Sequence, residues 1–191
     1  MPVRINEKLN LVLTIFGEDG SIQGYVHSVP ISYEVYEANY RLISQTYAEV
    51  MRNGADMFDM TGPMTALPSL RAVSRKLVGS DGDAEGMAQP LMAEMRRLSN
   101  AILPKDSGWE PVPFQVAIDR KLLSVEDIRE VEGTLLFFTC CSVMLPRPLR
   151  VNLSTAVQAW GGQTSSLNVT AFIASLQTST AIGSTGATEA A

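Results

Sequence analysis

The feature that most constrains the fold is the apolar segment from Thr134 to Leu145. It continues a helical pattern that begins near Glu126 with acidic residues and becomes almost wholly apolar after Glu132. A helix that is apolar on all sides is normally the buried centre of a helical protein. The segment is also shorter than the roughly 20 residues needed to span a bilayer. We therefore expect it to form the core of a soluble domain.

The composition is that of one globular domain. The chain has 191 residues, of which 46% are hydrophobic and 18% charged, a low charge density for a soluble protein. Its net charge of -5 provides no overall basic field for nucleic acid or anionic lipid. The N-terminus lacks the apolar core of a signal peptide, so we expect a cytoplasmic protein with neither a nucleic-acid nor a membrane partner.

A β-hairpin is predicted at about residues 8–28. Apolar side chains alternate with polar ones over residues 9–15, which is typical of a half-buried strand, and residues 17–20 (GEDG) form a turn. A second strand is expected from Ser21 to His27. Because a lone hairpin is marginally stable in water, it should dock on helices or on another chain.

The rest of the body reads as helical, over about residues 33–176. Helices are predicted from Tyr33 to about Gly54, from about Leu67 to Leu77, around Leu91–Leu98 and along the apolar segment, with shorter ones at 114–123, 149–160 and 169–176. Residues 105–113, which carry Trp109, read as a loop. From Gln177 onward the chain consists almost entirely of Thr, Ser, Ala and Gly, with little that could pack. The expected fold is therefore mainly α: a single helical domain over residues 1–177, an N-terminal hairpin and a flexible tail at 178–191.

No residue pattern indicates catalysis or a cofactor. The single histidine, His27, has no nucleophile elbow with it, and one histidine excludes most histidine-based metal sites. Residues 81–86 (DGDAEG) resemble half a calcium loop, but the position of the final bidentate acid falls on Met92. Cys140 and Cys141 lie in the apolar helix, without a cation to stabilise a thiolate. We therefore predict no catalytic, cofactor or metal residues, and a protein that is not an enzyme.

Binding or assembly is favoured instead. Nine methionines offer adaptable apolar surface, the hairpin can expose a strand edge, and tyrosine is enriched at interfaces. The same residues could equally belong to ordinary core packing. We expect self-association through the N-terminal third, with these partner-binding candidates: Leu11, Tyr25, Tyr36, Tyr40 and Tyr47.

Several stretches carry a family resemblance. They are Tyr25–Ser32 with Thr61–Pro63, Leu91–Asn100 with Trp109–Pro113, and Trp160–Asn168 with Ser175–Thr180. Together the chain resembles small tail-module proteins of long-tailed bacteriophages that are taken to be tail assembly chaperones. The resemblance implies a helical protein of the host cell cytoplasm that coats the tape measure protein, recruits tail tube subunits and leaves before the virion is complete. Many such chaperones also have a longer, frameshifted form.

Two alternatives stay open. One is a permanent virion subunit, such as a tail or connector component, in which the hairpin and tail contact neighbouring subunits. The other is a small enzyme. Physically, a chaperone for a long apolar helix needs a groove in which an amphipathic helix can lie, repeated along the client by self-association.

Overall fold

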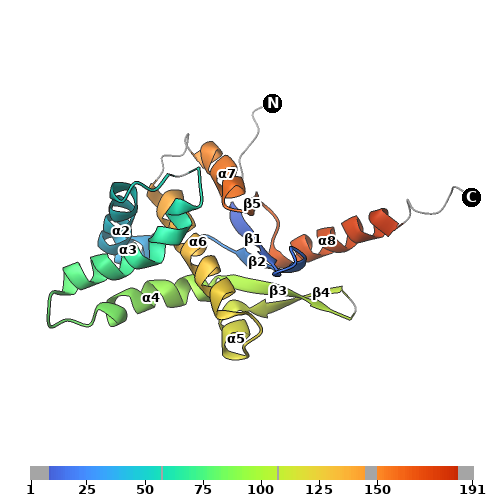
Figure 1. Cartoon of the computed structure of the whole chain (residues 1–191), viewed down its shortest axis with the longest axis horizontal. Coiled ribbons are helices and arrows are strands. Elements are labelled where there is room, and N and C mark those ends of the chain that lie inside the picture. The colour runs from blue at the N-terminus through green and yellow to red at the C-terminus, as the bar shows by residue number, and fades with distance from the viewer. Residues whose placement is uncertain (1–8, 57, 107, 145–149, 185–191) are drawn as a thin grey trace, which may run out of the picture.

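The computed structural model describes residues 9–56, 58–106, 108–144 and 150–184 and has a mixed α/β fold (Figure 1). The expectation of a mainly α protein is therefore wrong, because an antiparallel five-stranded sheet runs through the domain in the order β4-β3-β2-β1-β5. In chain order, the elements are β1 (Asn10–Phe16), β2 (Ile22–Ser28), α1 (Tyr33–Ala38), α2 (Tyr40–Arg52), α3 (Thr61–Val78), α4 (Ala84–Arg97), β3 (Ser99–Lys105), β4 (Gly108–Pro113), α5 (Phe114–Asp119), α6 (Val125–Met144), α7 (Arg150–Ala159), β5 (Gly162–Ser165) and α8 (Val169–Ser184).

The predicted hairpin exists, but it lies in the middle of the sheet. β1 pairs with β2 as expected, while the outer edge of β1 pairs with β5 and that of β2 with β3. Successive side chains of β1 point to opposite faces of the sheet, and both faces are covered. Leu11, Leu13 and Ile15 belong to the main core, and Val12 packs on the opposite face.

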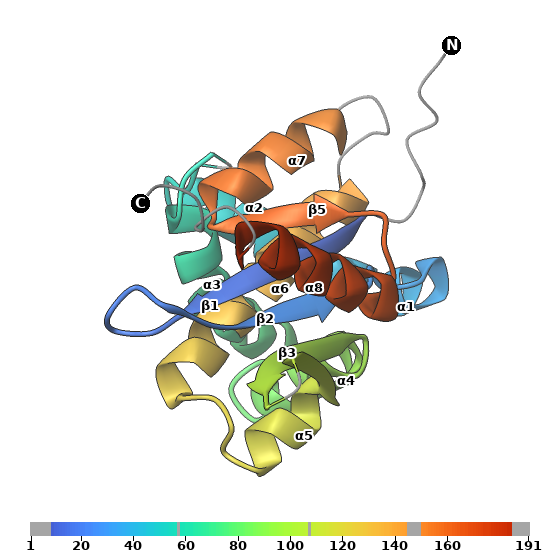
Figure 2. The same cartoon turned by 90° about the vertical axis from the view of Figure 1, so that its right-hand side faces the viewer.

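Helices cover the two faces unequally. On one face the main core is formed with α2, α3 and α6, and α6 supplies buried residues from Val131 to Cys141. The prediction that this helix is the centre of the protein therefore agrees with its burial. On the other face α8 lies across the strands, with Phe172 and Ile173 against Val12 and Ile102 (Figure 2).

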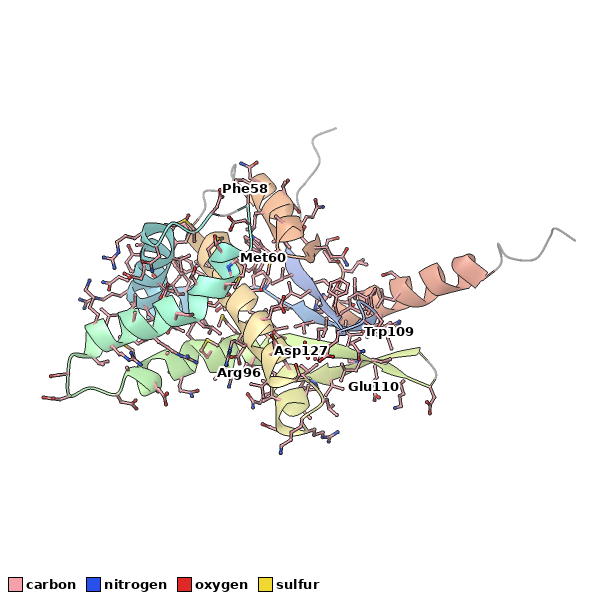
Figure 3. All side chains as sticks on the ribbon, in the orientation of Figure 1. Phe58, Met60, Arg96, Trp109, Glu110 and Asp127 are labelled. Carbon is pink, nitrogen blue, oxygen red and sulfur yellow. The ribbon has the colours of Figure 1, made fainter. Side chains whose placement is uncertain are left out.

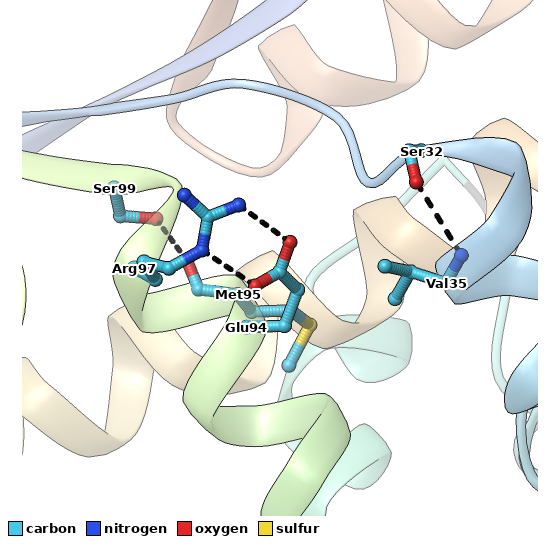
Figure 4. Close-up of polar contacts among 6 residues, drawn as sticks. All are labelled: Ser32, Val35, Glu94, Met95, Arg97 and Ser99. Carbon is cyan, nitrogen blue, oxygen red and sulfur yellow. Dashed lines mark hydrogen bonds and ion pairs between the residues drawn. The ribbon is translucent and has the colours of Figure 1, made fainter.

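Local signals in the sequence account for several helix ends. At the start of α1, the side chain of Ser32, a residue type that favours this position, accepts a hydrogen bond from the backbone N–H of Val35 (Figure 4). Before α6, Ser124 and Asp127 cap one another: each side chain accepts a hydrogen bond from the other's backbone N–H. This arrangement is a capping box with Asp in place of the usual Glu.

The C-terminal part differs from the sequence prediction in one element. α8 extends to Ser184, into the range 178–191 for which a flexible tail was predicted, and the rest of that range lies outside the described residues. Among the described residues, no helix combines the length and the hydropathy that crossing a bilayer requires.

Candidate binding groove between α3 and α6

A groove of about 560 Å³ lies between α3 and the N-terminal half of α6. Its α3 wall is a stripe of side chains that recur at helical spacing, and its α6 wall is polar. The lining residues are Met60, Pro63, Met64, Leu67, Pro68 and Arg71 on the α3 side, and Glu126, Arg129 and Glu130 on the α6 side.

The two helices cross closely beside the groove. Position 133 of α6 is glycine, and a Cβ there would lie 2.6 Å from the carbonyl oxygen of Pro63. A Cβ at Gly62 would likewise overlap the ring of Phe137. The two glycines therefore let the backbones approach, and the groove residues of α6 all precede Gly133.

Apolar side chains stay exposed along the groove. Met64 is 72% exposed; Phe58, which lies in the loop before α3 and outside the groove lining, is also exposed. Figure 3 places Phe58 and Met60 at the N-terminal end of α3 and Asp127 near the N-terminal end of α6. Exposed methionine suits a binding surface because its flexible, polarizable side chain adapts to different partners.

Two prolines shape the α3 wall. Pro63 lies in the first turn, where the missing N–H removes no helical hydrogen bond. Pro68 lies inside the helix and cannot donate to the carbonyl of Met64, yet its ring is exposed toward the groove. Pro68 therefore adds rigid apolar surface to the groove, whereas Pro63 is buried.

The charged side chains of the groove are not paired with each other. Arg71, Glu126, Arg129 and Glu130 are exposed, and within the described residues none of them forms an ion pair. This differs from α4, where Arg97 binds Glu94 one turn away (Figure 4) and Arg96 binds Glu132 of α6 at 2.6 Å. The charges on the groove are thus free to meet a ligand.

A smaller hollow of about 100 Å³ lies on the other side of α6. It shares Glu130 with the groove and includes Phe16, at the end of β1, and the buried Trp160. Phe16 is exposed and lies opposite the exposed Ile22 in the hairpin register. Apolar surface therefore flanks the N-terminal half of α6 on both sides.

The five predicted partner residues do not form one site. Leu11 is fully buried, and Tyr47 packs against the core, where burial raises its pKa. Tyr25 lies on the α8 face, 5.2 Å from Trp109 between ring centroids. Only Tyr36 and Tyr40 come together, with centroids 5.8 Å apart.

Tyr36 and Tyr40 belong to an aromatic cluster with Tyr33 at the start of the α1–α2 segment. Tyr33 and Tyr40 are exposed, and the Tyr33 and Tyr36 rings are 6.1 Å apart. The carboxylate of Glu37 raises the pKa of the Tyr33 hydroxyl. These tyrosines form an aromatic surface separate from the groove lining.

The side chain of His27 stabilises the fold. Its ring is buried, and Nε2 donates a hydrogen bond of 2.9 Å to the carbonyl oxygen of Leu167, which also accepts from Asn10 at 2.8 Å. The histidine and the asparagine together hold the loop between β5 and α8 against the sheet. Within the described residues, the other ring nitrogen of His27 has no hydrogen-bond partner.

The calcium-like loop and the two cysteines also serve the fold. Asp83, in the calcium-like loop, caps α4 by accepting from the N–H of Gly86, and within the described residues no group of three or more acidic, His or Cys residues could hold a metal ion. Cys140 and Cys141 are buried, and burial raises the pKa of the Cys140 thiol to about 12. Neither thiol therefore ionises readily in the folded protein.

Sequence reasoning missed the groove, although a signal was present. Met60, Met64, Leu67 and Arg71 recur at steps of four, three and four residues, which is one face of a helix. The expected helix began near Leu67, whereas α3 begins at Thr61. The start of α3, which carries the exposed Met64, therefore lay before the predicted regular helix, and the half-buried Met60 directly precedes α3.

Comparison with known proteins adds no relative. No protein-family model matches the chain, and the searches of curated proteins and of solved structures each found no match.

Proposed function

We propose that this protein is a tail assembly chaperone of a long-tailed bacteriophage, which binds the tape measure protein and recruits tail tube subunits in the host cell cytoplasm. The observation that carries the proposal is the Met-lined groove between α3 and α6. It offers an apolar floor and charged edges, the arrangement in which an amphipathic helix binds. The resemblance in sequence to phage tail-module proteins supports the choice of client.

For self-association we propose a surface other than the edge of the predicted hairpin. The hairpin cannot supply a strand edge, because both β1 and β2 are paired on both sides. The exposed aromatic cluster of Tyr33, Tyr36 and Tyr40 remains in the N-terminal third and is the better candidate for contact between copies. Copies associated in this way would present several grooves along one client, which multiplies weak affinities.

Co-expression with the tape measure protein of the same phage tests the proposal. We expect the two proteins to co-elute in size-exclusion chromatography as a large complex that contains several copies of the chaperone. Avidity of this kind typically raises affinity by about 10²–10⁴ over one site. A protein that always elutes alone, as a monomer, would refute the chaperone function.

A permanent virion subunit is the second candidate. It is favoured by α8, whose C-terminal half projects beyond the sheet and away from the body, where a neighbouring subunit could bind it (Figure 1). Mass spectrometry of purified particles separates the two candidates. A chaperone is absent from the mature virion, whereas a subunit is present in a fixed copy number.

A further inference from the structure

The two walls of the groove carry opposite charge. α3 has no acidic residue along Thr61–Val78, and its basic residues are Arg71, Arg75 and Lys76. The first two turns of α6, residues 125–132, contain one basic residue, Arg129, against four acidic ones: Glu126, Asp127, Glu130 and Glu132. Of these charged residues, only Arg71 of α3 and Glu126, Arg129 and Glu130 of α6 line the groove, so the α3 lining carries a charge of +1 and the α6 lining a net charge of -1.

These charges do not neutralise each other across the groove. Among the described residues, the only acidic residue of this part of α6 that forms an ion pair is Glu132, which binds Arg96 of α4 on the other side. Arg71 and Glu130 both line the groove without pairing. The apolar floor of Met64, Leu67 and Pro68 separates the two charged rims.

The dimensions of the floor define the ligand. The stripe from Met60 to Arg71 covers about 16 Å of helix, or three turns. A helix lying along it needs apolar residues at positions such as i, i+3 or i+4, and i+7. One flank then faces Arg71, and the other faces the α6 wall, where the acidic Glu126 and Glu130 outnumber the basic Arg129.

We propose that the groove binds an amphipathic helix whose one flank is acidic and whose other flank is basic, with the acidic flank against α3. This inference rests on the proposed function, because it takes the groove as the client site, and it adds the chemistry of the client. Turning a helix end for end in the groove exchanges its two flanks. The opposite charges of the walls therefore also fix the direction in which the client lies.

Three synthetic helical peptides with the same apolar stripe test the inference on the full-length protein. One has an acidic and a basic flank, one has two acidic flanks, and one has two basic flanks. In fluorescence anisotropy at low salt, the split-flank peptide should bind about tenfold more tightly than the others, because each of those meets one like-charged wall. High salt should reduce the difference. Equal affinities, or no binding by any peptide, would overturn the proposal.

Arg71→Glu gives a second readout, because it replaces the positive charge of the α3 wall that lines the groove. The preference should then move from the split-flank peptide toward the peptide with two basic flanks. Arg41→Glu makes the same change in net charge on α2, at an exposed arginine away from the groove, and should leave the preference unchanged. An unchanged preference in Arg71→Glu, or an equal change in Arg41→Glu, would contradict the assignment.

The outcome is separable from that of the proposed function. If the tape measure protein co-elutes but no peptide binds, the function stands and the charge-matched groove is wrong. If the split-flank peptide binds selectively but the tape measure protein never co-elutes, the groove chemistry is right and the chaperone function is wrong.

Discussion

Replacing Leu135 by aspartate should leave no soluble, folded protein. Leu135 is 2% exposed in the middle of α6, where it packs in the main core. A carboxylate buried there without a partner costs several kcal/mol, comparable with the whole stability of a domain at roughly 5–15 kcal/mol. Phe138→Asp should have the same effect, because Phe138 is equally buried. Soluble yield and thermal melting by circular dichroism give the measurement.

Val125→Asp is the matched control on the same helix. Val125 is 75% exposed in the first turn of α6, where an acidic residue interacts favourably with the helix dipole. This variant should express and melt like the wild type. A Leu135→Asp protein that melts cooperatively within a few degrees of the wild type would show that α6 is not the core.

The second large effect is expected for Arg96→Ala. Arg96 links α4 to α6 through two nitrogens on the same carboxylate oxygen of Glu132, at 2.6 and 2.7 Å, and also donates to Gln115 at 3.4 Å. Without the guanidinium, the Glu132 carboxylate is left buried and unpaired. Removing one partner of a buried ion pair costs about 3–5 kcal/mol. We expect the free energy of unfolding, measured with urea, to fall by about 3 kcal/mol. This is the low end of the range, because the Arg96 side chain is partly exposed.

The neighbouring Arg97 provides the control. It pairs with Glu94 within α4 at 2.7 Å, but its side chain is 68% exposed. Solvent screens exposed pairs of this kind, so Arg97→Ala should hardly change the free energy of unfolding. Equal losses in the two variants would mean that the Arg96–Glu132 pair does not hold α4 to α6.

The helices and the hairpin could be predicted because their signals are local. The alternation at residues 9–15, the N-cap at Ser32 and the apolar run of α6 each specify one element without reference to the rest of the chain. The helices around 91–98, 149–160 and 169–176 follow in the same way from spacing. What these signals do not specify is which elements lie side by side.

The three additional strands were missed for physical reasons. β3 and β4 contain Pro104, Pro111 and Pro113, and proline normally argues against a strand because it cannot donate to the ladder. β4 tolerates two of them because it is an edge strand. β5 is only four polar or small residues long, and pairing with β1 rather than its own composition makes it a strand.

The candidate site was harder to predict than the fold. The tyrosine-rich helix did point to an exposed aromatic cluster, but Leu11 and Tyr47 proved to be core residues, because an apolar side chain on an amphipathic element marks the core as readily as an interface. The groove is formed by α3 and α6 together, and the sequence does not show directly that these two helices are neighbours. Gly62 and Gly133, which allow their close crossing, lie 71 positions apart in the sequence.

Site-specific photo-crosslinking tests most directly whether the groove holds the client. A photoreactive benzoylphenylalanine replaces Met64 in one variant and Gln89, an exposed residue of α4, in the other, and each is co-expressed with the tape measure protein and irradiated. The account predicts a covalent adduct from position 64 and none from position 89. A stable complex that gives no adduct from position 64, or equal adducts from both positions, would contradict it.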